Sequence, residues 1–106
     1  MPRVKGRLIE APRDANQSER VREYEQLGCI VIDLGSIGMG CPDLLIGCAG
    51  VTDLAEVKMP DEDLLPSQQT FNARWRGSRA WLVRTLDDVI AHVKDMRRRA
   101  REQAKR

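Results

Sequence analysis

The sequence predicts a single small α/β domain in which helices pack against a mixed sheet. Short apolar runs typical of strands alternate with segments of helical periodicity, in the order α-β-β-β-α-β-α. A chain of 106 residues with 42% hydrophobic residues can build one core, although a small one. Glycine and proline mark several boundaries between the segments.

The first expected helix begins at Asp14 or Asn16, because each has capping-box spacing to a later polar residue, and it ends near Leu27. Gly28 suits the position just beyond the last turn of that helix. Residues 29–32 are a short apolar run, which predicts the first strand.

Two further apolar runs, residues 44–46 and residues 54–58, predict the next two strands. The first of them is continuously apolar, which is typical of a strand covered on both faces. Residues 47–53 join the two runs and begin with turn composition. We therefore expect a hairpin centred near Ala49.

An acidic loop over residues 60–66 leads to the second helix. Ser67 can cap this helix, which we expect over residues 68–76 and ended by Gly77. Residues 80–84 follow as an apolar run and predict the last strand.

The last helix has a recognisable start, because Thr85 with Asp88 has the spacing of a cap. Its apolar residues recur at helical spacing, at Leu86, Val89, Ile90 and Val93. His92 is expected on the polar, exposed side of this helix.

The two hairpin strands carry charged residues where a buried strand should have none. The hairpin would place Asp43 opposite Glu56, and the two-residue period of a strand puts Glu56 and Lys58 on one face. Paired carboxylates bind a hard cation such as Mg²⁺, and an adjacent Lys can orient a water or offset phosphate charge. The set suits metal-assisted hydrolysis of a phosphodiester.

A plainer interpretation stays open, since a carboxylate at a strand edge and a Glu-x-Lys on a solvated face are ordinary. Against it, an Asp that opens so apolar a strand is costly unless the carboxylate has a partner.

Pro42-Asp43 followed by Glu56-Val57-Lys58 resembles the PD-(D/E)XK nuclease signature. Four further stretches resemble the small phage-type members related to VRR-NUC nucleases: residues 14–17, 40–47, 65–68 and 75–77. The similarity runs from about Asp14 to Val93. It implies the αβββαβ core of restriction-endonuclease-like folds, with a mixed central sheet and a C-terminal helix.

The resemblance also implies a role for each motif residue. Asp43 and Glu56 would bind Mg²⁺ or Mn²⁺, joined by the backbone carbonyl of Val57. Lys58 would contact the attacking water or the scissile phosphate. Gln68 is similar to a glutamine that faces the active site in many such nucleases, although it could instead be a solvated residue at a helix start.

An acidic residue on the first helix often completes such sites. Glu19 has the better chemistry for a hard cation, but it could equally serve as a capping residue. Gln17 matches the glutamine of the phage-type members and could contact the substrate. The two residues cannot point in one direction on a helix, so the choice between them stays open.

Positive charge gathers at the two ends of a chain whose net charge is only +2. We expect a basic N-terminal arm over residues 1–13, a nuclease domain over residues 14–96 and a basic helical tail over residues 97–106. Phosphate contacts are predicted in the tail, at Arg97, Arg98 and Arg99, with solubility as the alternative role. Trp75 and Trp81 are expected in the core or at an interface, with base stacking as the alternative.

The sequence excludes several other classes. No stretch approaches eighteen apolar residues, so no membrane span is expected, and no apolar signal-peptide core is present. Three cysteines without CxxC spacing predict free thiols in a reducing cytoplasm. The resemblance adds a phage- or prophage-encoded type and no organic cofactor. Zinc would need more ligands than these cysteines and His92 supply.

The expected function is therefore a Mg²⁺- or Mn²⁺-dependent DNA endonuclease, selective for a junction, a flap or a nick. Family members that cut junctions act as dimers, so a homodimer is expected, with its contact on the last helix or the strand before it. The alternative to a dimer is a monomer whose apolar residues all cover the sheet, which would favour a nickase. The alternative is a non-catalytic nucleic-acid-binding or assembly protein that keeps the nuclease fold. A subunit that needs a partner protein for specificity is a third possibility.

Overall fold

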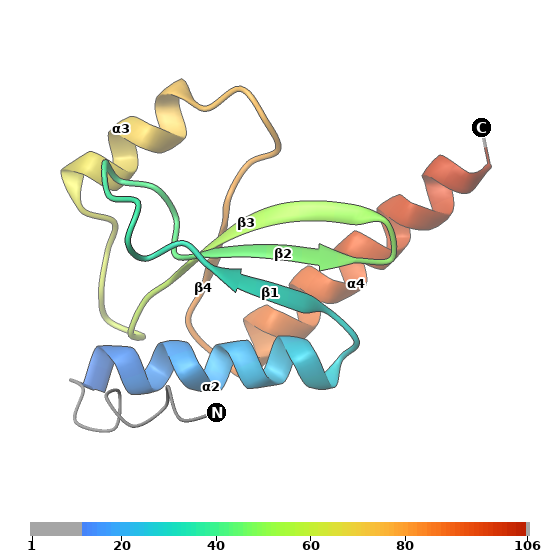
Figure 1. The fold of residues 1–106 in the computed structure, drawn as a ribbon, viewed down its shortest axis with the longest axis horizontal. Helices are drawn as coiled ribbons and strands as arrows, with labels where there is room; N and C mark the ends of the chain where they lie inside the picture. Colours follow the sequence, from blue (N-terminus) through green and yellow to red (C-terminus); the bar gives the residue numbers. More distant parts are fainter. Residues whose placement is uncertain (1–11, 106) are drawn as a thin grey trace.

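The computed structural model describes residues 12–105, with side chains from residue 15 onward (Figure 1). The basic arm predicted over residues 1–13 therefore lies almost wholly outside the described residues. The elements are α2 (Pro12–Gln26), β1 (Ile30–Asp33), β2 (Leu44–Cys48), β3 (Val51–Val57), α3 (Pro66–Arg74), β4 (Trp81–Val83) and α4 (Leu86–Ala104). This order is the one that the sequence predicts, so the α-β-β-β-α-β-α arrangement is confirmed.

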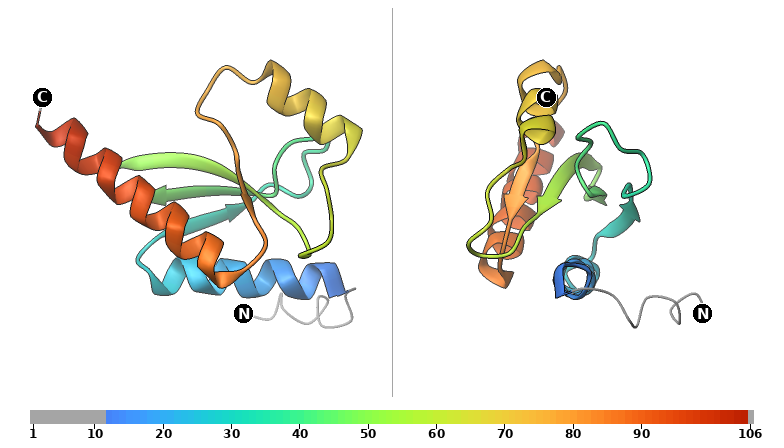
Figure 2. Two further views of the ribbon diagram at one scale, coloured as in Figure 1. Left: turned by 180° about the vertical axis from the view of Figure 1, so that it is seen from behind. Right: turned by 90° about the vertical axis from the view of Figure 1, so that its left-hand side faces the viewer.

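The four strands form one mixed sheet in the order β1-β2-β3-β4. The first three strands are antiparallel, and β4 runs parallel to β3. Helices α2 and α4 contact each other and pack against the sheet, whereas α3 stands apart from both of them (Figures 1 and 2). Along β2, the buried side chains of Leu44, Ile46 and Cys48 alternate with the half-buried Leu45 and Gly47. One face of the sheet is therefore less covered than the continuous apolar run suggests.

The hairpin between β2 and β3 turns at Ala49, as predicted. Cys48 pairs with Val51, which leaves Ala49 and Gly50 as the two turn residues. Their φ angles of 55° and 86° lie in the left-handed region that a two-residue hairpin turn requires at both positions. The turn is shorter than the sequence suggests, because residues 51–53 already belong to β3.

The start of α3 differs from the prediction. The helix begins at Pro66 and follows an N-cap at Leu65 rather than Ser67. The Oε1 atom of Gln68 accepts a hydrogen bond from the Leu65 backbone N–H at 2.8 Å, so the cap comes from inside the helix. The helix also ends earlier than predicted, because Trp75 already has extended dihedral angles.

The cap predicted for α4 is confirmed. Thr85 is the N-cap, and its side chain accepts a hydrogen bond from the Asp88 backbone N–H. The helix then continues without a break to Ala104, so the basic residues of the tail up to that point belong to α4. Val89 and Val93 are fully or almost fully buried against the sheet, whereas Leu86 is exposed and Ile90 is half-buried, so half of the apolar stripe of α4 is unavailable for a partner. None of the described helices is long and apolar enough to cross a membrane.

The expectation for His92 is wrong, because this residue is fully buried. Its Nδ1 atom lies 2.7 Å from the Tyr24 hydroxyl and its Nε2 atom lies 2.7 Å from an Asp53 carboxylate oxygen. The Trp81 ring stacks on the imidazole with 4.4 Å between ring centroids. His92 can be buried because partners on three elements satisfy both ring nitrogens and cover its face.

Asp53 is the centre of this buried network. Its carboxylate accepts hydrogen bonds from both Nη atoms of Arg99 in addition to the contact with His92. Burial acts to raise the pKa of Asp53, but the hydrogen bonds from His92 and Arg99, together with the charge of Arg99, outweigh it and hold the pKa below its ordinary value. The charged form of Asp53 therefore stabilises the fold.

Asp53→Asn should lower the free energy of unfolding near neutral pH by about 2 to 3 kcal/mol, since it removes hydrogen bonds to a charged group. The depressed pKa contributes stability above the unfolded value of about 4, and this contribution is lost as pH falls through the folded value. Denaturant unfolding of wild type and variant between pH 2 and 7 measures the effect. Asp61→Asn, in an exposed loop, is the control. Parallel curves for wild type and Asp53→Asn would contradict a stabilising charge.

Candidate active site

The hairpin register brings the motif residues together at the start of β2 and the end of β3. Leu44 pairs with Ala55, so continuing the ladder by one residue places Asp43 beside Glu56. The Asp43 Oδ2 atom accepts a hydrogen bond from the Val57 backbone N–H at 2.9 Å. The Leu34 backbone N–H donates to the Asp43 carbonyl at 2.7 Å, which anchors this residue from the β1 side. Asp43 is therefore held on both sides by the backbone.

Glu56 lies at the same end of β3 and is only 3% exposed. The Nε2 atom of Gln68 donates a hydrogen bond to Glu56 Oε2 at 3.0 Å. The other end of that amide is fixed as well, because its Oε1 atom accepts from the Leu65 backbone N–H. Gln68 thus ties the first turn of α3 to the Glu56 carboxylate. Its neighbour Gln69 is exposed and contacts the Leu64 carbonyl instead.

Lys58 is buried to the same degree, at 2% exposure. Two backbone hydrogen bonds hold it: its N–H donates to the Val83 carbonyl at 3.0 Å, and its carbonyl accepts from Asn16 Nδ2 at 3.1 Å. Since Glu56 and Lys58 are two residues apart at the end of β3, their side chains leave the chain on the same side. Among the side chains of residues 15–105, no carboxylate lies within ion-pair distance of the Lys58 ammonium.

The negative charge at this end of the sheet affects the pKa of a neighbouring thiol, that of Cys41. Burial raises the pKa of Cys41, and the negative charges of Glu56 and Asp43 raise it further. Both carboxylates thus act on one half-buried position. A bound cation would offset their combined charge.

The side chains present fit a magnesium site of the common kind. No group of three or more His, Cys, Asp or Glu side chains within the described range could hold a metal by itself. Mg²⁺ does not require one, because it usually keeps several waters and takes one or two carboxylates. Asp43 and Glu56 supply two carboxylates, and the backbone carbonyl of Val57 is the further oxygen ligand that the motif suggests.

The fold that carries these residues can be compared with known structures. A solved structure described as a "VRR_NUC domain" superposes with a TM-score of 0.66 and 27% sequence identity. The match covers 80% of this chain and 97% of that chain. The chain has a VRR_NUC-type nuclease fold. Neither a family model nor a curated protein sequence matches it. The restriction-endonuclease-like class expected from the motif is thereby confirmed at the level of the fold.

In this VRR_NUC-type fold, the first helix contributes differently from the expectation. Glu19 is exposed, and its carboxylate lies 3.5 Å from the Arg20 guanidinium rather than beside Asp43 or Glu56. Gln17 donates from Nε2 to Asp33 Oδ2 at 3.3 Å, at the end of β1. The geometry therefore supports neither residue as a direct neighbour of the two carboxylates.

Among the α2 side chains that the structure describes, Asn16 reaches the site, through its hydrogen bond to the Lys58 carbonyl. The sequence contained only a weak signal for it, since Asn16 could be assigned a role as a helix cap. The link depends on how α2 crosses the end of β3, which no local pattern specifies.

The three arginines predicted to contact phosphate have partners within the VRR_NUC-type fold. Arg97 donates to the Leu27 carbonyl, Arg98 pairs with Asp95 and Glu102, and Arg99 pairs with Asp53 and Asp95. Arg99 is thus a structural residue of the buried network. A phosphate contact at Arg97 or Arg98 would have to compete with these bonds.

Proposed function

We propose that this protein is a Mg²⁺- or Mn²⁺-dependent endodeoxyribonuclease. The observation that carries the proposal is the convergence of Asp43, Glu56 and Lys58 at one end of the β2–β3 hairpin. The VRR_NUC-type fold supports a nuclease and DNA as its substrate.

Each residue has a defined part in the proposed reaction. Asp43 and Glu56 would hold the cation, which supplies Lewis-acid stabilisation and a more acidic bound water. The Val57 N–H positions the Asp43 carboxylate. Gln68 positions the Glu56 carboxylate. The Lys58 ammonium offsets the negative charge that develops on the phosphate as the attacking oxygen approaches.

We further propose that the substrate is branched, nicked or flapped DNA. A domain of this size has little surface for an extended duplex, so recognition of shape at a strand discontinuity suits it better than a long sequence. The three free cysteines agree with a reducing compartment such as the cytoplasm of a host cell.

The competing function is a non-catalytic nucleic-acid-binding or assembly protein. The positioned carboxylates argue against it, since binding alone does not need Glu56 to be buried and oriented by Gln68. Incubation with labelled linear, nicked, flap and four-way DNA tests the proposal. Cleavage with Mg²⁺ or Mn²⁺ but not with excess chelator is expected. Binding without cleavage under any metal condition would instead favour the non-catalytic function.

We also propose a homodimer, and we assign its contact surface to β1 rather than to α4. Ile30 is 72% exposed and Ile32 is 54% exposed on the same face of this strand. Ile32 pairs with the half-buried Leu45, so the apolar surface continues onto β2. Within the described part of the chain, β1 has a neighbouring strand on one side only. An apolar edge strand of this kind is a ready surface for a second copy.

Light scattering at micromolar concentration should give twice the 12.0 kDa mass of one chain. Ile32→Lys should reduce the mass to that of one chain, because a buried unpaired charge opposes the contact. Leu86→Lys is the matched control, since Leu86 is 46% exposed on the helix that the sequence favoured. A wild-type mass of one chain that stays unchanged with four-way DNA would contradict the dimer and favour a nickase.

A further inference from the structure

The surface formed by α3 and the loop after it is strongly positive. Residues 64–86 contain four arginines and no acidic residue. Three of them are exposed and lie close together in the chain, at Arg74, Arg76 and Arg79. Among the side chains that the structure describes, those of residues 15–105, no ion pair joins any of these three arginines to a carboxylate. Arg97, Arg98 and Arg99 of α4, by contrast, pair with acidic residues or a backbone carbonyl.

An aromatic side chain lies among these arginines. Trp75 is 47% exposed, whereas Trp81 is partly buried and stacks on His92. The Phe71 ring stacks on the Trp75 indole, with 5.2 Å between centroids and 19° between planes. A Cβ atom at position 77 would lie 2.7 Å from the indole Nε1 of Trp75, so the close approach of the backbone to the indole requires glycine at this position. The indole is therefore fixed in orientation while much of it faces solvent.

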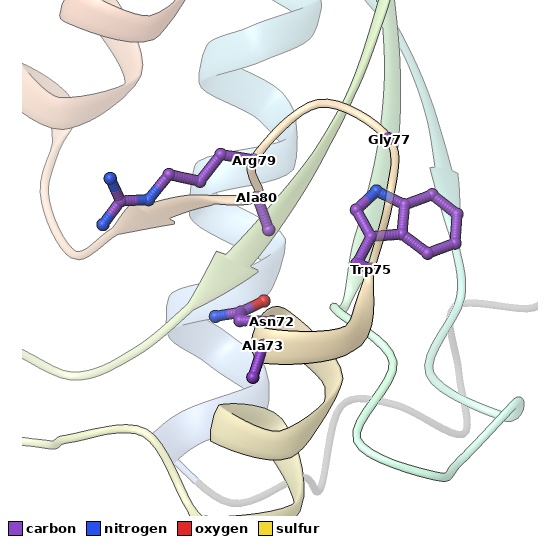
Figure 3. Close-up of a pocket in the computed structure, with 6 residues that line it drawn as sticks. All are labelled: Asn72, Ala73, Trp75, Gly77, Arg79 and Ala80. Atoms are coloured by element: carbon purple, nitrogen blue, oxygen red, sulfur yellow. The ribbon is translucent and has the colours of Figure 1, made fainter.

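The same segment borders a hollow of about 400 Å³. It is lined by Asn72, Ala73, Trp75, Gly77, Arg79 and Ala80 (Figure 3). Figure 3 shows Trp75 and Arg79 extending to opposite sides of the loop, with Asn72 on α3. The hollow is thus bordered by an aromatic surface, a cation and an amide, which come from α3 and the loop after it.

This surface is continuous with the candidate active site through α3. Gln68, which contacts Glu56, lies on the same helix seven residues before Trp75, about 10 Å along a helix axis. The helix is also packed closely against the loop before Asp43, because a Cβ on Gly40 would overlap the Ser67 carbonyl oxygen. In a duplex that rises about 3.4 Å per base, the separation along α3 corresponds to roughly three nucleotides.

We propose that this α3 surface binds the DNA strand near the cleaved phosphate, with an unpaired base stacked on Trp75. Arg74, Arg76 and Arg79 would contact the flanking phosphates. This inference rests on the proposed function for its ligand. Arginines interleaved with an exposed, fixed aromatic are the arrangement that binds single-stranded nucleic acid. An acidic protein segment would use the arginines but not the indole.

The first test measures affinity in chelator, so that cleavage plays no part. Anisotropy titrations use a labelled oligo-dT strand of about 20 nucleotides, long enough for a site of this class, and a blunt duplex of the same length. Trp75→Ala should weaken binding of the single strand about 5- to 150-fold, the range found for loss of one stacked base. Trp75→Phe should recover most of that loss. The duplex, which has no unpaired base, should lose less than the single strand.

The second test measures the salt dependence of the same binding. Changing Arg74, Arg76 and Arg79 together to Gln should reduce the slope of log affinity against log salt by about 2 for the single strand. The control changes three exposed cations on other elements, Arg22, Lys94 and Arg101, to Gln. Far-UV circular dichroism checks that all variants keep the fold.

The outcomes separate this inference from the proposed function. Unchanged affinity in Trp75→Ala, or equal slopes for the two triple variants, would overturn the inference even if the wild type cuts DNA. A polyglutamate competitor as effective as oligo-dT would also overturn it. Loss of binding in the α3 variants, in a protein that cleaves under no metal condition, would uphold the DNA-binding surface and reject the nuclease.

Discussion

Asp43→Asn and Glu56→Gln should each abolish DNA cleavage, with a loss of about 10³-fold or more, while DNA binding in chelator is retained. Each change removes one of the two carboxylates that would hold the cation, and with it the charge that the reaction needs. Both substitutions preserve shape. In Asp43→Asn the amide oxygen could still accept from the Val57 N–H, and in Glu56→Gln the amide oxygen could still accept from Gln68.

The measurement is the single-turnover cleavage rate of the best substrate over a range of Mg²⁺ and Mn²⁺ concentrations. Asp33→Asn is the matched control, because Asp33 is an exposed carboxylate on the neighbouring strand that contacts Gln17. Thermal unfolding of each variant separates loss of the site from loss of the fold. Full activity in either Asp43→Asn or Glu56→Gln, or undiminished activity in excess chelator, would contradict the proposed metal site.

Lys58→Met should lower the cleavage rate by about 10²-fold, the effect of losing one electrostatic stabiliser of the transition state. The affinity for DNA should change by much less, because the Lys58 side chain is almost fully buried and little of it can act as a surface phosphate contact. Met retains the unbranched apolar stem, so this change avoids the cavity that Ala would leave.

Rates at saturating DNA and affinities in chelator must be compared for the same variant. Lys94→Met, on the exposed side of α4, controls for the loss of one positive charge. Equal losses of rate and affinity would make Lys58 a phosphate clamp. A normal rate would remove it from the chemistry altogether.

Much of the architecture could be predicted because it depends on short-range patterns. Thr85 and Asp88 specify the start of α4 through neighbouring backbone groups. Ala49 and Gly50 are the hairpin turn, and their position sets the register that places Asp43 beside Glu56. The order of elements and the VRR_NUC-type fold follow from the same local signals, together with the PD…ExK motif.

The sequence by itself therefore determined the hairpin, its register and the residues that the hairpin brings together. Only the tertiary structure decided which polar groups are buried. His92 and Asp53 look like surface and turn residues in the sequence, yet they lie at the centre of the fold because Tyr24, Trp81 and Arg99 arrive from distant segments. A charge or an imidazole can be buried only where other groups satisfy it, and here those groups come from residues far along the chain. The periodicity of a local segment does not predict such contacts.

Tertiary packing also decides which apolar side chains remain exposed on the surface. The apolar stripe of α4 suggested a dimer contact, but Val89 and Val93 are buried against the sheet. Ile30 and Ile32 of β1 are exposed instead. Trp75 was expected in the core or at an interface, and it lies outside the core. A sequence shows which side chains are apolar or charged. Whether each meets protein or solvent is set by how α2, α3 and α4 pack around one small sheet, and that packing is a property of the whole chain.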